Sequence, residues 1–203
     1  MTKTLTALAL TCSLKPSPAE SSSDLLGSQI LDALAEHDVT GSLVRVVDHV
    51  ISPGVEADMG GDDEWPTLRE RVLAADILVF VTPTWMGQHS SVAQRVLERL
   101  DAELAETDDQ GRPILFDKVA IAAVVGNEDG AHHIAAILFQ SLNDVGYTIP
   151  AQGSVYWNGE AMQTVDYKDL PKTPEKVAQA TATAARNAAH LARDLTDGGY
   201  PAE

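Results

Sequence analysis

A run of five consecutive apolar residues, Ile77 to Val81, constrains the fold of this chain more than any other feature of its sequence. A strand with one face in water alternates apolar and polar residues, whereas this run has no polar position. Both of its faces must therefore be covered, which is typical of a central strand in a parallel sheet. We expect this strand to span residues 76–82.

The rest of the chain alternates between short apolar segments and segments in which apolar residues recur at helical spacing. The pattern predicts strands at residues 5–12, 43–47, 76–82, 118–125 and 148–157. It predicts helices at residues 24–37, 66–75, 90–104, 131–145 and 177–195. Five strands that alternate with five helices indicate an α/β fold, with a parallel sheet between two helical layers. We expect a single domain over residues 1–203, with a frayed tail at residues 196–203.

Charge and cysteine content narrow the range of partners. The chain carries 14 basic and 30 acidic residues, a formal net charge of −16. This balance argues against nucleic acid and an anionic membrane as partners, because clustered Lys and Arg bind both. The single cysteine, Cys12, excludes an intrachain disulfide, and cytoplasmic residence is the simpler expectation. No segment approaches the roughly 20 apolar residues that cross a bilayer.

Three loops of unusual composition follow predicted strands, at residues 13–23, 83–89 and 126–133. In an open parallel sheet, ligands bind beyond the carboxyl ends of the strands, where the strand order reverses. With the strand order 2-1-3-4-5, that point lies between strands one and three, beside Ser13 and Pro83. We therefore expect the three loops to form one binding crevice. A further long loop, at residues 50–65, is a candidate excursion over a site.

The first loop has the composition of a phosphate site. Three serines directly precede a predicted helix, where hydroxyls and free backbone N–H groups point outward together. The candidate phosphate ligands are Ser13, Lys15, Ser21, Ser22 and Ser23. In the alternative interpretation, Ser23 only caps the helix and the other serines fill the loop. The loop has neither the Walker pattern nor the dinucleotide glycine pattern, which disfavours a nucleoside triphosphate or a Rossmann-bound NAD.

The second loop, T-P-T-W-M-G-Q, offers a broad apolar surface. Trp85 can lie against a planar ring, Gly87 permits close backbone approach, and Gln88 can bind a ring carbonyl. Pro83 fixes the exit of the chain from the strand. In the alternative interpretation, Trp85 covers the core or a subunit interface.

The third loop, G-N-E-D-G, is followed by His132 and His133 at a predicted helix start. Its two glycines expose backbone N–H groups, and one of the two histidines at most is expected to reach the site. The two histidines with Glu128 and Asp129 lack a recognised ligand spacing, so we predict no metal site.

Together these three loops resemble those of the flavodoxin-like superfamily of NADPH-dependent FMN reductases and quinone reductases. The most specific motif is P-x-[aromatic]-x-G in the second loop, and the first loop matches a looser pattern of serines around a basic residue. The resemblance runs from the first to the fifth strand and implies a flavodoxin-like three-layer sandwich. The chain departs from the pattern at Cys12, where many relatives have glycine, and in a longer insert at residues 16–20.

The resemblance implies a non-covalent FMN, with its phosphate on the first loop and its isoalloxazine against Pro83, Thr84, Trp85, Met86, Gly87 and Gln88. It also implies that the pyrimidine edge of the ring is bordered by Gly126, Asn127, Gly130 and His133. The flavin would carry the chemistry, so we assign no catalytic side chain. Backbone N–H groups with Gln88 or His133 would stabilise the reduced flavin. NADPH or NADH would be the transient electron donor and a quinone or free flavin the acceptor. Many relatives are homodimers or homotetramers, which makes Trp65 and Trp157 candidate subunit contacts.

Two other functions fit the same fold. A flavodoxin-type electron carrier would dock a basic redox partner on the acidic surface. This chain is longer than such carriers, however, and lacks their T-x-T/S-G-x-T phosphate loop. A binding protein without turnover would retain FMN and oxidise no nicotinamide. A response regulator is disfavoured, because it needs acidic residues where this chain has Thr11, Cys12 and Ser13.

Overall fold

A computed structural model describes residues 4–160 and 165–201 of the chain. Five parallel strands form the sheet: β1 (Leu5–Thr11), β2 (Val39–Arg45), β3 (Ile77–Trp85), β5 (Val119–Gly126) and β6 (Ser154–Asn158). They lie in the order β2-β1-β3-β5-β6, and a two-residue strand, β4 (Gln88–His89), pairs antiparallel with β3. The predicted order 2-1-3-4-5 is confirmed, and only the numbering differs, because β4 was not predicted.

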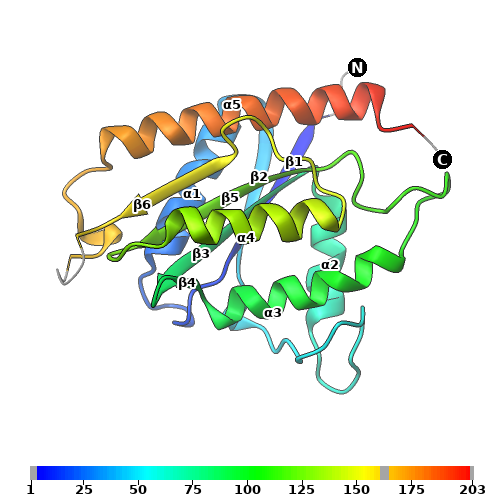
Figure 1. The fold of residues 1–203 in the computed structure, drawn as a ribbon, viewed down its shortest axis with the longest axis horizontal. Helices are drawn as coiled ribbons and strands as arrows, with labels where there is room; N and C mark the ends of the chain where they lie inside the picture. The colour runs from blue at the N-terminus through cyan, green and yellow to red at the C-terminus, as the bar shows by residue number, and fades with distance from the viewer. Residues whose placement is uncertain (1–3, 161–164, 202–203) are drawn as a thin grey trace.

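Helices cover both faces of the sheet, as Figure 1 shows. One face carries α1 (Ser22–Ala35) and α5 (Glu175–Gly198), and the other carries α2 (Trp65–Ala74), α3 (Ser91–Leu100) and α4 (Ala131–Asp144). Short 3-10 helices are η1 (Val46–Asp48), η2 (Asp101–Ala105) and η3 (Tyr167–Asp169). This is the predicted α/β sandwich of three layers. In the part of the chain that the structure describes, no helix is long and apolar enough to cross a bilayer.

Strand β3 is the centre of both hydrophobic cores. Leu78 and Phe80 belong to the core beneath α2, α3 and α4, whereas Val79 and its neighbours on the opposite face belong to the core beneath α1 and α5. The side chains of residues 77–81 are at most 1% exposed. Burying each such side chain contributes about 1.5–3 kcal/mol. The absence of any polar residue in this run is thus explained by burial on both sides.

The last strand is shorter than predicted, covering residues 154–158 instead of 148–157. Thr148 forms only an isolated bridge with Val119. Pro150 has no N–H to donate to a ladder, and its carbonyl accepts from Gly153 N at 2.9 Å in a tight turn. Gln152 has a positive φ of 57° within this turn. The turn therefore interrupts the parallel pairing with β5, which resumes where Ser154 lies opposite Ala122.

The C-terminal segment is more ordered than predicted. Helix α5 continues to Gly198, inside the stretch 196–203 that we expected to be frayed. Beyond it, Tyr200 N donates to Asp117 Oδ1 at 2.7 Å, and the Tyr200 ring lies 5.2 Å from the ring of Phe116. These contacts are made with residues about 80 positions away, so local sequence did not reveal them.

Candidate functional site

A cavity opens where β1 and β3 end side by side. Cys12 N donates to Val81 O at 2.8 Å, and Ser90 Oγ donates to Cys12 O at 2.7 Å, so the two strand ends are tied together. The cavity beyond them has a volume of about 380 Å³, within the roughly 300–1,000 Å³ of small-molecule sites. It lies at the predicted crevice between the first and third strands.

The predicted residues divide into two groups. Those that line the cavity are Ser13, Lys15, Ser21, Ser22, Ser23, Pro83, Thr84, Trp85, Gly126 and Asn127. Those that are not among the lining residues are Met86, Gly87, Gln88, Gly130 and His133. The structure therefore brings the first loop together with the starts of the other two, and leaves the rest of those two loops outside.

The hydroxyl-rich end of the cavity is the start of helix α1. Ser21 is the N-cap residue, because its Oγ accepts from Asp24 N at 3.2 Å and its carbonyl accepts the helical bond from Leu25 N. The idea that Ser23 caps the helix is therefore wrong; Ser23 lies inside the first turn and is 2% exposed. The N–H groups of Ser22 and Ser23 precede the helical hydrogen-bond ladder, which leaves them for an anion.

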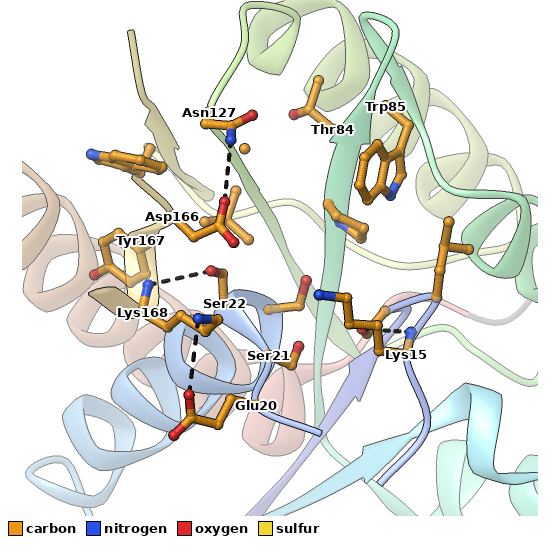
Figure 2. A pocket seen from close by; sticks show the side chains of 17 residues that line it. Lys15, Glu20, Ser21, Ser22, Thr84, Trp85, Asn127, Asp166, Tyr167 and Lys168 are labelled. Carbon is orange, nitrogen blue, oxygen red and sulfur yellow. Dashed lines mark hydrogen bonds and ion pairs between the residues drawn. The ribbon is translucent and has the colours of Figure 1, made fainter. Parts of the chain in front are cut away.

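Lys15 brings a positive charge to this end. Its backbone N donates to Ser13 Oγ at 3.2 Å, and its side chain reaches into the cavity toward the serines (Figure 2). Cys12, one residue before Ser13, is buried without a positive φ, so glycine is not required there. Burial raises the pKa of the Cys12 thiol above its ordinary value, and the thiol is neutral.

The opposite end of the cavity is apolar and aromatic. Trp85, which is 52% exposed, forms one wall (Figure 2). Trp157 also lines the cavity, and its ring centre lies 5.5 Å from that of Tyr167. The Thr84 hydroxyl is buried and has no hydrogen-bond partner among the described residues. A Cβ on Gly126 would lie 2.7 Å from Thr84 Cβ, so only glycine allows β5 to approach β3 here.

Hairpin geometry explains why the rest of the second loop lies outside the cavity. The segment predicted as a loop continues β3 into β4 through a two-residue turn, with positive φ at Met86 (52°) and Gly87 (73°). Met86 is 91% exposed at its tip. Gln88 Oε1 pairs with His133 Nε2 at 3.1 Å instead of facing a ligand. A Cβ on Gly130 would lie 2.8 Å from Gly87 Cα, so this glycine serves loop packing.

Several lining residues were not predicted. They are Leu14, Glu20, Val125, Trp157, Asp166, Tyr167 and Lys168. The first three lie in or beside the predicted loops. The last four come from the end of β6 and the segment after it, which packs against the start of α1. The position of the fifth strand beside the crevice was the one signal that pointed there, because its carboxyl end lies at the same edge of the sheet.

The expectation that residues 50–65 lie over the site is wrong. The loop before α2 does not line the cavity, and Trp65 at its end is 0% exposed, so it is no subunit contact. Trp157 contributes to the cavity wall. Among residues 4–160 and 165–201, no group of three His, Cys, Asp or Glu side chains is arranged to hold a metal ion.

Comparison with protein families decides the class of this chain. Residues 5–161 match the family described as NADPH-dependent FMN reductase. The chain belongs to the NADPH-dependent FMN reductase family. The family match and the flavodoxin-like solved structures confirm the fold and the family resemblance noted in the sequence.

Two curated proteins are similar in sequence to this member of the FMN reductase family. The divalent metal cation transporter MntH of Mycobacterium bovis is 40% identical over 169 residues, which cover 81% of this chain and 25% of MntH. The 8-demethyl-8-aminoriboflavin-5'-phosphate synthase of Streptomyces davaonensis is 34% identical over 166 residues, covering 77% of this chain and 65% of the synthase. The chain thus spans a quarter of one relative and 65% of the other.

Solved structures agree with the family. RosB, with bound intermediate 8-demethyl-8-formylriboflavin-5'-phosphate, superposes with a TM-score of 0.87 at 31% identity, over 97% of this chain and 82% of RosB. An NADH:FMN oxidoreductase, EMOB, has a TM-score of 0.64 at 17% identity, over 93% of this chain and 88% of that protein. The second similarity shows the fold alone.

Proposed function

We propose that this chain binds FMN non-covalently in the cavity and transfers hydride from NADPH or NADH to a quinone, a free flavin or a similar small acceptor. The observation that carries the proposal is that one cavity joins a hydroxyl-rich helix start to an aromatic wall. A phosphate is suited to the first end and a flat ring to the second. FMN has both groups in one molecule.

The phosphate end fits FMN through its donors. The N–H groups of Ser22 and Ser23, the hydroxyls around them and the ammonium of Lys15 all favour an anion. Asp24, the acidic residue in the first turn of this helix, is held by Arg45, whose Nε lies 2.8 Å from Asp24 Oδ2. That pairing neutralises the carboxylate of the first turn.

The ring end fits through shape and through an unpaired polar group. Pro83, Trp85 and Val125 offer apolar surface for a planar ring. The unpartnered Thr84 hydroxyl can hydrogen-bond a polar ring atom, which removes the cost of its burial. Asn127 is oriented by its Nδ2, which donates to Asp166 Oδ1 at 3.2 Å, and its amide oxygen remains to accept.

The protein's part in the chemistry is to bind, orient and restrict access. Bound FMN supplies reversible hydride transfer at its ring. The rim at Leu14 (44% exposed) and Trp85 (52% exposed) is the side from which a nicotinamide or an acceptor would enter. The two strand ends and the start of α1 close the opposite side. No side-chain acid or base is required.

An absorbance experiment tests the proposed activity. The purified protein is loaded with FMN, freed of excess flavin and mixed anaerobically with NADPH or NADH. We expect the visible band of oxidised flavin to fade with at least one nucleotide and to return when a quinone is added. Retention of FMN without fading with either nucleotide would show that the protein is not a reductase. Stable one-electron reduction during titration would instead favour an electron carrier.

A second candidate function follows from the relatives that act on flavin phosphates. RosB is 31% identical over 97% of this chain and holds a modified riboflavin phosphate as an intermediate. We propose as the alternative that a flavin 5'-phosphate is this chain's substrate and not its resident cofactor. Mass spectrometry of the flavin recovered after incubation distinguishes the two. Unchanged FMN after nicotinamide oxidation supports the reductase, and a changed flavin mass supports the alternative.

We also propose that the chain forms a homodimer or homotetramer through the tip of the β3–β4 hairpin, beside the entrance to the cavity. Met86 is 91% exposed at this tip, and a second copy would cover its apolar side chain. Sedimentation velocity tests the idea, and a monomer at all accessible concentrations would refute it.

A further inference from the structure

Residues 166–168 line one side of the cavity and lie beyond the family match, which ends at residue 161; we call them the clamp segment. Tyr167 anchors the clamp segment and is 2% exposed. Its hydroxyl donates to Gln29 Oε1 in α1 at 2.6 Å, and its ring packs on Trp157. The clamp segment is therefore fixed to the same helix that provides the serines.

Lys168 of the clamp segment lies beside those serines. Its backbone N donates to Ser22 Oγ at 3.3 Å, which ties its position to the first turn of α1. Its side chain is 22% exposed. Figure 2 shows Lys168 on one side of Ser21 and Ser22 and Lys15 on the other. The two lysines flank the position proposed for the phosphate.

The charge on Lys168 is available to an anion. Its Nζ lies 2.7 Å from Asp169 Oδ1 and 3.9 Å from Glu20 Oε2. The hydrogen bond to Asp169 raises the pKa of Lys168 despite partial desolvation, so the ammonium is charged at neutral pH. The contact with Glu20 is long and its carboxylate is 85% exposed, so water screens it. With three N–H donors, the ammonium can keep Asp169 and still donate to another oxygen.

We infer that, given the flavin site proposed above, Lys168 is a second phosphate-binding residue and makes the cavity prefer flavins with a 5'-phosphate over riboflavin. A phosphate monoester carries about −1.5 to −2 charges near pH 7. Among the described residues that line the cavity, Lys15 and Lys168 are the cations, and Glu20 and Asp166 are the anions. Glu20 is 85% exposed and Asp166 accepts a hydrogen bond from Asn127, so the two lysines are the groups placed to meet the phosphate charge. Riboflavin has the same ring and ribityl chain but no phosphate, and it gains nothing from either lysine.

Binding of two flavins to matched variants tests the assignment. Wild type, Lys168→Gln and Lys172→Gln are titrated with FMN and with riboflavin, and dissociation constants are measured from flavin fluorescence at fixed ionic strength. Lys172 is an exposed lysine outside the cavity lining and serves as the control. We expect Lys168→Gln to raise the Kd for FMN about tenfold and to change that for riboflavin by less than about twofold. Lys172→Gln should leave both within about twofold.

Several outcomes would overturn the assignment. Equal losses for both flavins in Lys168→Gln would mean that Lys168 only supports the cavity wall. An unchanged Kd for FMN would also refute it, while leaving the proposed FMN site standing. Wild-type protein that binds neither flavin would remove the site itself. If the Lys168→Gln variant unfolds, the same titrations are made with Lys168→Met, which keeps the apolar stem of the side chain. Lys168→Arg keeps the positive charge and should retain the preference for FMN.

Discussion

Arg99 and Asp63 form an ion pair outside the cavity lining, and both of its side chains are buried. Both side chains are 0% exposed, and Arg99 Nη1 lies 2.8 Å from Asp63 Oδ2. Arg99 also donates to the carbonyls of Ser52, at 3.0 Å, and Glu56, at 2.9 Å. Its guanidinium carbon lies 5.6 Å from the centre of the Trp65 ring. One side chain thus holds the loop before α2 against α3.

Removing the arginine should destabilise the protein without affecting the cavity. In Arg99→Met, the Asp63 carboxylate stays buried without its cation, which costs about 3–5 kcal/mol of the free energy of unfolding. Arg95 is the matched control, because it is exposed in the same helix and donates to Ile51 O at 3.1 Å. Arg95→Met should cost about 1 kcal/mol. Urea unfolding measures both, and equal losses would contradict a special role for the buried pair.

The same pair makes stability depend on acid pH. Burial by itself would raise the pKa of Asp63, but hydrogen bonds from three backbone N–H groups and Arg99 outweigh it and lower that pKa to about 2. A depressed pKa means that the stabilisation is present above about pH 4 and is lost as pH falls toward about 2. The shift from the ordinary 3.8 corresponds to about 2 kcal/mol.

Asp63→Asn tests this pH dependence. Urea unfolding is measured for wild type and variant at about pH 5 and about pH 2. We expect the variant to be less stable at the higher pH, and its stability to fall by about 2 kcal/mol less between the two pH values. Parallel pH profiles would show that another carboxylate is responsible.

At the scale of elements, the β3–β4 hairpin depends on the loop that follows β5. Met86 N at the turn donates to Glu128 Oε1 at 2.7 Å. Gly130, with a φ of 140°, approaches so closely that a Cβ would lie 2.8 Å from Gly87 Cα and 2.9 Å from its carbonyl oxygen. Both contacts are with backbone atoms, which cannot rotate away. The hairpin carries Trp85, so its position sets one wall of the cavity.

Gly130→Ala should therefore move the hairpin and weaken FMN binding. We expect a loss of stability of about 1–3 kcal/mol and a rise of several-fold in the Kd for FMN. Gly111→Ala is the control, because Gly111 has a φ of 77° but no atom within 4 Å of an added Cβ. It should show the backbone strain alone, with no effect on FMN. Thermal unfolding measures the stability of both variants, and flavin fluorescence measures their Kd for FMN. Equal Kd values for FMN in Gly130→Ala and wild type would refute the link between the hairpin position and FMN binding.

At this scale, the sequence predicts an element when the residues that determine it are neighbours in the chain, and misses it when they are far apart. Strand β3 could be predicted from its own apolar run. The serines of the first loop could be predicted as a phosphate site because they directly precede a helix. The hairpin could not, because its turn is supported by Glu128, 42 residues from Met86. The clamp segment could not either, since the Tyr167 hydroxyl is held by Gln29, 138 residues away. The cavity walls formed by Trp85 and by the clamp segment thus depend on contacts that no local pattern encodes.

At the scale of the whole molecule, the sheet separates two cores and leaves the cavity at its carboxyl edge. Helix α5 packs closely on the sheet because most of its buried residues are alanines. The outer surface carries the net charge of −16. The electrostatic field of this acidic surface repels an anionic ligand at a distance. Inside the cavity, Lys15 and Lys168 attract the same ligand once it makes contact.

This opposition predicts how FMN binding responds to salt. The screening length falls from about 30 Å at 0.01 M salt to about 8 Å at 0.15 M, so salt removes the repulsion before it removes contacts inside the cavity. We expect the association rate of FMN to rise several-fold over this range, and that of uncharged riboflavin to stay constant. Stopped-flow quenching of flavin fluorescence measures both rates. A rate for FMN that falls with salt would mean that the two lysines, and not the acidic surface, govern its approach.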